Sequence, residues 1–322
     1  MVDMSHDHEI KHLNKIDRRK FLKTTTVLSG VALLGNLIEM TDASALTPST
    51  LPGFSLFANS VKVIKGSKYY LVESNGIPAH QMMVGIKSWQ QQVPTIQNYT
   101  GGNAWSIPIK PVIATKSISA KDHFLRGAIA IAVNGVPIFN ALNNRGDDAL
   151  LAGELDDWGG HCGRADDYHY HIAPTHLQLI VGKKLPIAYA LDGFPIYGQT
   201  EVDGKKVTGL DSLNGHFDSK KNYHYHASAK YPYINGGFKG VVTEIDGQVD
   251  PQALTKAFRP AGEPLRGATI TGLERTGENA FDLKYSLNGA EYHVKYTATL
   301  SQVSMEFIDP NGTSRSEVYQ RK

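Results

Sequence analysis

The sequence predicts a mainly β protein with antiparallel sheets, long loops, few short helices and an internal two-fold repeat. Three observations carry this prediction. Two tetrapeptides, Tyr168–His171 and Tyr223–His226, alternate tyrosine and histidine with the two-residue period that is typical of a β-strand. The 31 glycines and 15 prolines favour turns and loops over long helices. Residues 268–308 contain short β-like runs that alternate with turn sequences.

Composition limits the class of protein. With 322 residues, the chain has room for one large domain or two modest ones, and 41% hydrophobic with 20% charged residues is typical of a globular protein. The 33 Lys and Arg nearly balance the 31 Asp and Glu, so we expect no nucleic-acid partner held by bulk charge. Cys162 is the single cysteine, which excludes an intramolecular disulfide and a CxxC site.

The N-terminus has the pattern of an export signal. The pair Arg18-Arg19 is followed by an uncharged stretch over residues 24–37 and by Ala43-Ser44-Ala45, a typical cleavage site. We therefore expect a twin-arginine signal peptide over residues 1–45, with the twin-arginine translocase as a partner. The stretch is too short for a confident membrane span, so no permanent span is expected after cleavage. The expected location is the periplasm or the extracellular space of a bacterium.

The tetrapeptides belong to a longer repeat that covers about residues 133–173 and 191–228. They stand 55 residues apart (168 to 223), and a Gly-His pair and an aspartate precede each one at the same spacing. Further upstream, the motif at 134–139 returns at 192–197, 58 residues later. The paired segments are Gly160-His161 with Gly215-His216, Asp156 with Asp211, and Asn134-Gly135-Val136-Pro137-Ile138-Phe139 with Asp192-Gly193-Phe194-Pro195-Ile196-Tyr197. We expect one supersecondary unit used twice.

The histidines of each unit have the spacing of metal ligands. In a strand, His169 and His171 project from one face about 6.6 Å apart, and two imidazoles at that spacing can converge on one ion. A third histidine arrives from the preceding Gly-His loop. The predicted ligands are His161, His169, His171, His216, His224 and His226, in one shared site or two equivalent sites. Imidazole suits copper and zinc equally, so both metals remain open.

Further residues are candidates around this histidine set. Asp156 and Asp211 are expected to hydrogen-bond the non-ligating nitrogens of the ligands and fix their tautomers. His80, which follows Pro78-Ala79, is an extra candidate ligand. Without metal, the same Tyr and His residues would form a hydrogen-bonded polar core. Alternatively, Tyr, Trp and His residues of a metal-free β domain would form a surface that binds an envelope glycan or a protein partner. An enzymatic role is left open, with a metal-dependent hydrolase and a copper oxidoreductase as the two options.

These motifs resemble those of the YHYH-domain family, a bacterial family named for the tetrapeptide. The resemblance also covers Ser74–His80, Ala132–Pro137, Asp192–Gly198 and Pro260–Gly267, and thus most of the chain after the signal. It implies a secreted or periplasmic protein but names no reaction. Family members often carry Asn-Gly-His or Ala-His before the tetrapeptide. This chain carries Gly160-His161-Cys162, and the Cys162 thiol, a further candidate ligand, would favour copper if it points inward.

The sequence divides into three parts. After the signal over 1–45, residues 46–249 are expected to form the YHYH domain. Residues 250–322 are expected to form a small C-terminal β meander, because β-like runs there are separated by turns. Asn288-Gly289 is the strongest hairpin signal among those turns.

Overall fold

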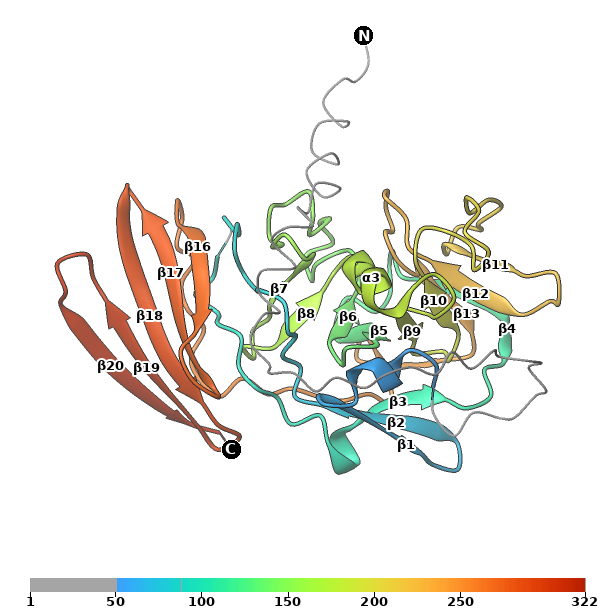
Figure 1. Cartoon of the computed structure of the whole chain (residues 1–322), viewed down its shortest axis with the longest axis horizontal. Helices are drawn as coiled ribbons and strands as arrows, with labels where there is room; N and C mark the ends of the chain where they lie inside the picture. The colour runs from blue at the N-terminus through green and yellow to red at the C-terminus, as the bar shows by residue number, and fades with distance from the viewer. Residues whose placement is uncertain (1–50, 88, 322) are drawn as a thin grey trace, which may run out of the picture. The chain divides into compact units, whose positions relative to one another are not determined.

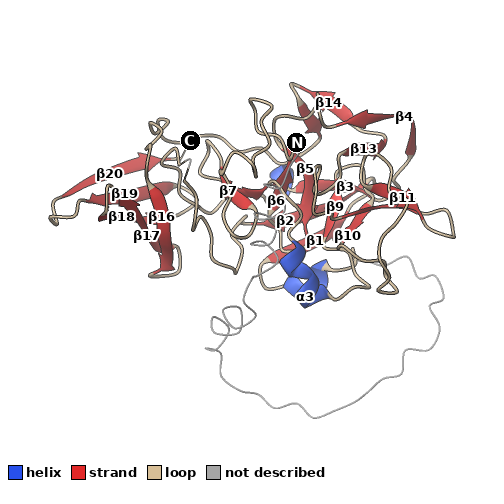
Figure 2. Ribbon diagram, turned by 90° about the horizontal axis from the view of Figure 1, so that it is seen from above, coloured by secondary structure: helices blue, strands red, loops and turns tan. Residues whose placement is uncertain are grey.

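The computed structural model describes residues 51–87 and 89–321, so the predicted signal peptide lies outside the described residues. Strands make up 38% of the described residues and helices 5%, and the mainly β prediction is confirmed. The helical elements of the described residues are three 3-10 turns and one short α-helix, α3, drawn in blue in Figure 2. Their bounds are η1 (Phe54–Phe57), η2 (Gly101–Asn103), η3 (Thr175–Leu177) and α3 (Gln178–Val181).

An eight-stranded sheet carries both tetrapeptides (Figure 1). Its strand order is β11-β12-β10-β9-β5-β6-β8-β7, with β5 and β9 paired antiparallel at the centre. On each side the next pairing is antiparallel, then parallel, then antiparallel. The strands are β5 (Ala128–Ala132), β6 (Pro137–Phe139), β7 (Gly160–Cys162), β8 (Tyr168–Tyr170), β9 (Ala188–Ala190), β10 (Pro195–Tyr197), β11 (Gly215–Phe217) and β12 (Tyr223–His226). The order reads the same from either end when β5–β8 are matched with β9–β12. The internal two-fold repeat itself stays a prediction.

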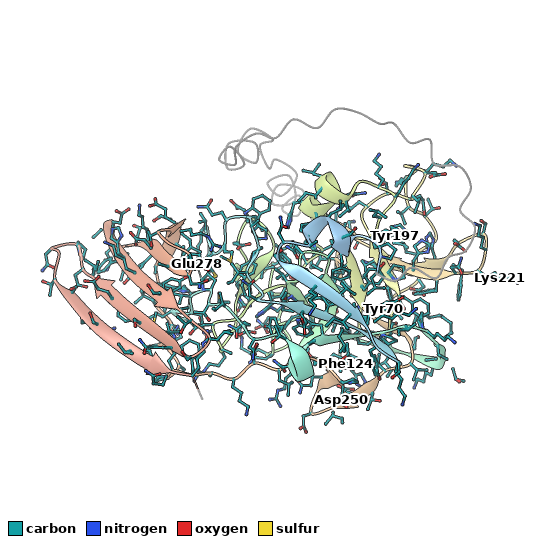
Figure 3. The ribbon with its side chains drawn as sticks, turned by 60° about the horizontal axis from the view of Figure 1, so that its bottom comes forward. Tyr70, Phe124, Tyr197, Lys221, Asp250 and Glu278 are labelled. Atoms are coloured by element: carbon teal, nitrogen blue, oxygen red, sulfur yellow. The ribbon has the colours of Figure 1, made fainter. Side chains whose placement is uncertain are left out.

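The central strands of this sheet are apolar because they are buried. All five residues of β5, with the sequence Ala-Ile-Ala-Ile-Ala, are buried, as expected for a strand covered on both faces. The rings of Tyr168, Tyr170 and Tyr225 are among the largest fully buried side chains. Tyr70 and Phe124 also lie among packed side chains, whereas Lys221, at the turn between β11 and β12, is exposed (Figure 3).

Smaller sheets surround the eight-stranded one. A three-stranded antiparallel sheet has the order β1-β2-β3, and two further pairs are β4 with β13 and β14 with β15. The strands are β1 (Val61–Lys65), β2 (Tyr69–Ser74), β3 (Trp105–Pro108), β4 (Ile113–Ser119), β13 (Gly237–Gly240), β14 (Thr243–Ile245) and β15 (Gln248–Asp250). Within the described part of the chain, no helix is long and apolar enough to cross a membrane.

The C-terminal strands form a separate five-stranded antiparallel sheet in sequence order. Its members are β16 (Thr269–Arg275), β17 (Ala280–Leu287), β18 (Ala290–Ala298), β19 (Gln302–Ile308) and β20 (Ser314–Gln320). Asn288-Gly289 joins β17 to β18 with φ of 53° and 81°, the left-handed values that a two-residue hairpin turn needs. The division of the chain into domains at residues 45 and 250 stays a prediction.

Candidate metal sites

The first tetrapeptide places a histidine triad on one face of the sheet. We call His161, His169 and His171 site 1. His161 on β7 lies directly opposite His169 on β8, and His171 follows β8 on the same face. The Nε2 atom of His171 lies 3.1 Å from Nε2 of His169 and 3.0 Å from Nε2 of His161. The strand alternation that the sequence predicts therefore brings three imidazole nitrogens together.

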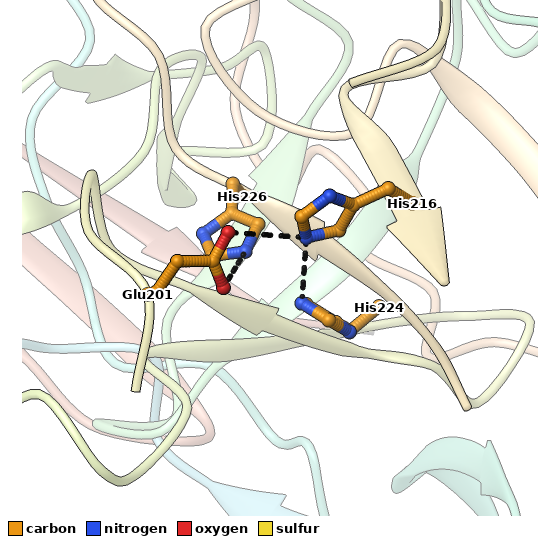
Figure 4. A group of neighbouring side chains, drawn as sticks. All are labelled: Glu201, His216, His224 and His226. Carbon is orange, nitrogen blue, oxygen red and sulfur yellow. Dashed lines mark hydrogen bonds and ion pairs between the residues drawn. The ribbon is translucent and has the colours of Figure 1, made fainter. Parts of the chain in front are cut away.

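The second tetrapeptide builds an equivalent triad, with a carboxylate added. We call Glu201, His216, His224 and His226 site 2, and Figure 4 shows the four side chains converging. Nε2 of His216 lies 3.0 Å from Nε2 of His224. The two Glu201 carboxylate oxygens lie 3.5 Å from Nε2 of His216 and 3.7 Å from Nε2 of His226. In each site, the donor atoms all lie within 4.8 Å of one another.

Backbone carbonyls fix the orientation of the imidazole rings. In site 1, Nδ1 of His169 donates to the carbonyl of Asp167 at 2.9 Å, and Nδ1 of His171 donates to the carbonyl of Asn140. In site 2, Nδ1 of His216 and of His226 donate to the carbonyls of Thr208 and Gly198, at 3.0 and 2.9 Å. A carbonyl can only accept, so Nδ1 carries the hydrogen in these four rings, and Nε2 of the neutral ring is a bare lone pair.

Two of these lone pairs face each other in site 1, and one is left unpaired in site 2. In site 1, Nε2 of His169 and of His171 are both acceptors, so their separation of 3.1 Å is no ordinary hydrogen bond and calls for a cation between them. Burial, with the neighbouring His169, lowers the pKa of His171 to about 3, and burial also lowers the pKa of His161. In site 2, Nε2 of the fully buried His226 makes no hydrogen bond. This arrangement fits a metal ion.

Asp156 and Asp211 have a different task from the predicted one. The structure shows no contact of either carboxylate with the nitrogens of the triads. Oδ1 of Asp156 accepts the backbone N–H groups of Trp158 and Gly160, and Oδ2 accepts the Tyr168 hydroxyl at 2.8 Å. Asp211 makes the corresponding turn and tyrosine bonds, with the Tyr223 hydroxyl at 2.9 Å, whereas Oδ2 of Asp156 also accepts the Met83 N–H at 2.7 Å. Each aspartate thus shapes the turn before the Gly-His strand and anchors a tyrosine on the opposite face.

Cys162 and His80 lie outside both groups of candidate ligands. Cys162 pairs with Tyr168 in the β7–β8 ladder, so it faces the side of the sheet opposite His161 and His169, and burial raises the pKa of its thiol. His80 stacks on Trp158, and its Nε2 contacts the Tyr170 hydroxyl at 2.5 Å. The sequence reasoning placed these two residues near the metal, whereas the structure places them on the tyrosine side of the strands.

Among the candidate ligands in the described part of the chain, Glu201 is the one that sequence reasoning missed. It lies after β10 in a loop, 15 residues before His216 (201 to 216), and belongs to no motif. The offset of 58 residues would have paired it with Asn143 in the first unit (143 to 201). The two residues begin similar turns, because Asn143 N–H donates to the carbonyl of Asp147 as Glu201 N–H donates to that of Lys205.

The comparisons with known proteins add one finding. A family model described as YHYH protein matches residues 104–207. The matched range includes all of site 1 and Glu201, whereas the three histidines of site 2 lie beyond it. No curated protein and no solved structure matches the chain. The resemblance that the motifs predicted is therefore confirmed over residues 104–207.

Proposed function

We propose that this protein binds transition-metal ions, copper or zinc, at site 1 and site 2. The observation that carries the proposal is the pair of facing Nε2 lone pairs of His169 and His171, which lie 3.1 Å apart while both Nδ1 atoms donate to backbone carbonyls. The Nε2 atoms of His171 and His161, and those of His216 and His224, approach to 3.0 Å. Ligating histidines typically donate their other nitrogen to such a carbonyl, which fixes the tautomer that the metal needs.

The donor sets support these two metals over others. Site 1 offers three imidazoles, and site 2 offers three imidazoles and a carboxylate, both familiar sets for zinc and copper. A magnesium or calcium site would be built mainly from oxygen. Because Cys162 faces the other side of the sheet, the thiolate argument that would have favoured copper no longer applies.

Metal stoichiometry tests the proposal. Elemental analysis of protein loaded with copper or zinc and then desalted should find two ions per chain in the wild type. It should find one ion in His169→Ala/His171→Ala and one in His224→Ala/His226→Ala, because each pair removes two of the three nitrogens of one site. His293→Ala is the matched control, since His293 lies on β18 beside Asp282 and outside both sites. It should keep both ions.

A folded wild-type protein that takes up neither metal would contradict the proposal. The histidines would then be the polar core or the glycan- or partner-binding surface of a metal-free β domain. Circular dichroism of each variant separates loss of a ligand from loss of the fold. A loss of stability in the double variants with no metal to lose would favour the polar core.

We further propose that the protein is exported by the twin-arginine translocase to the periplasm or beyond, with residues 1–45 removed. The support is the sequence pattern around Arg18 and Arg19. A translocase that carries folded proteins would allow metal to be inserted before export. Replacing both arginines with lysine should leave the precursor in the cytoplasm, and an exported protein whose intact mass still includes Met1 would contradict the cleavage.

A further inference from the structure

Sites 1 and 2 differ at the position that supplies the fourth donor. Asn143 and Glu201 occupy the same turn: Gly146 N–H donates to the carbonyl of Asn143 at 2.9 Å, and Gly204 N–H donates to that of Glu201 at 2.8 Å. The carboxylate of Glu201 points at two histidines of site 2. An uncharged amide stands in its place in site 1.

Glu154, a carboxylate that lines the same pocket as the three histidines of site 1, is already engaged. Glu154 is buried, accepts from the Asn143 amide at 3.3 Å on both oxygens, and is paired with the Arg145 guanidinium. It does not belong to the group of converging donors. Among residues 51–87 and 89–321, the ligands of site 1 are therefore the three imidazoles alone, and an ion there keeps at least one position for another ligand.

Site 1 opens into a pocket. A cavity of about 260 Å³ is lined by the three histidines of site 1 together with Asn143, Arg126 and Arg164. The volume lies just under the range of typical small-molecule pockets, so the ligand that fits is small.

The charge on the pocket wall is positive. Arg126 donates to the carbonyl of Asp246 and Arg164 donates to the carbonyl of Arg259, and neither forms an ion pair within the described part of the chain. Arg145, also on the wall, is neutralised by Glu154 and Asp147. The guanidinium charges of Arg126 and Arg164 are thus not neutralised by an ion pair, and both groups line the same pocket as the three histidines.

We infer that site 1 is a binding site for a small oxyanion, a carboxylate or a phosphate, which completes the coordination of the metal with one oxygen and pairs with Arg126 and Arg164. Guanidinium groups match the planar, bidentate geometry of these anions. Site 2 is closed by its own carboxylate and takes no such ligand. The inference rests on the proposed metal binding and adds the class of ligand.

Visible absorption of the Co²⁺-loaded protein tests the inference, because the spectrum of this ion reports its coordination. Metal content is measured first. Inorganic phosphate and acetate are then added separately to the wild type, to His224→Ala/His226→Ala, which keeps only site 1, and to His169→Ala/His171→Ala, which keeps only site 2. We expect a saturable spectral change in the first two proteins and none in the third. The anion that binds more tightly identifies phosphate or carboxylate as the ligand.

The arginines are tested in the wild-type background, so that no histidine variant needs to fold. Arg126→Gln/Arg164→Gln should weaken anion binding roughly 10–100-fold, the effect of losing charge-assisted hydrogen bonds, with the Co²⁺ content unchanged. Lys221→Gln, an exposed cation on the β11–β12 turn, is the control and should bind the anion as the wild type does.

Two metal ions with no spectral change, with an equal change in the protein that keeps only site 2, or with anion binding that ignores the arginines, would overturn the inference and leave metal binding standing. A site 1 that takes up no metal would overturn both.

Discussion

Sites 1 and 2 are built from the same parts and differ in what surrounds them. Each takes two histidines from a Tyr-His-Tyr-His segment and a third from the neighbouring strand. In each, hydrogen bonds to backbone carbonyls orient the imidazole rings. The strands therefore set the three nitrogens in the same way. The residue beside each triad differs, because the loop after β6 places Asn143 next to site 1 and the loop after β10 places Glu201 in site 2. If the sites bind metal as proposed, the sheet fixes the triad, and a single loop residue closes the site or leaves it open.

The largest effect is expected from the residue that separates the two sites. Glu201→Gln keeps the size of the side chain and removes its charge, so the metal affinity of site 2 should fall about 1000-fold, more than the 10–100-fold typical of a partner one step further from the ion. Competition with a chelating dye in the His169→Ala/His171→Ala background measures it. Glu154→Gln, in the background that keeps only site 1, is the control and should change the affinity of site 1 less than about 10-fold.

An affinity of site 2 that survives Glu201→Gln would remove the distinction between a closed and an open site. Of the four donor groups in Figure 4, only the three histidines would then contribute to the metal affinity.

A second difference lies at Asn134 and Asp192, which occupy matching positions and both contact a tyrosine hydroxyl. Burial raises the pKa of Asp192 to about 6 from its ordinary value of 3.8. The folded protein therefore holds this proton more tightly than the unfolded chain does. The stability that the proton contributes is complete below about pH 4 and is lost as the pH rises through about 6, at most about 3 kcal/mol.

Asp192→Asn should remove that part of the pH dependence. Urea unfolding of the metal-free protein at pH 4 and pH 7 measures the difference, and Asp156, whose pKa burial also raises to about 6, is present in both proteins and cancels. Identical pH dependence in wild type and variant would show that Asp192 does not titrate in this range.

The smallest effect concerns the turn aspartates, where the two halves differ in burial. Asp156 is buried and Asp211 is exposed, although each accepts a tyrosine hydroxyl. Tyr168→Phe leaves a buried carboxylate short of one donor and should lower the free energy of unfolding by about 1–2 kcal/mol, whereas Tyr223→Phe should cost about 0.5 kcal/mol, because water can replace the hydroxyl. Urea unfolding at pH 7 compares the two variants directly. Equal losses would mean that water reaches both carboxylates.

Much of this architecture follows from the sequence by simple geometry. The alternation of Tyr and His predicts strands with all histidines on one face, and the structure has Tyr168–Tyr170 on β8 and Tyr223–His226 on β12. The same alternation, applied one residue beyond His161, would have placed Cys162 on the tyrosine face. The sequence pattern alone could therefore have excluded the Cys162 thiol as a metal ligand.

Other features could not be read from motifs. The aspartate of Asp-x3-Gly-His serves the turn, since its short side chain reaches the N–H groups two and four residues ahead, and this local demand outweighs a bond to a histidine on the other face. Glu201 reaches its site only because the loop after β10 folds back over the strand, and no local periodicity encodes such a contact. The position of His80 beside Trp158 and Tyr170 depends on packing between segments 90 residues apart.

The ring-orienting carbonyls have a consequence for the order in which the protein assembles. In site 1 the most distant bond, from His171 to Asn140, spans 31 residues, and in site 2 the bond from His226 to Gly198 spans 28. Closing loops of this length costs little chain entropy, and contacts that are local in sequence form fast. Each site is thus complete within one short stretch of chain, without the other half. Once residues up to 171 have been synthesised and have left the ribosome, every donor of site 1 is present. An ion can then bind at site 1 while the second half is still being synthesised.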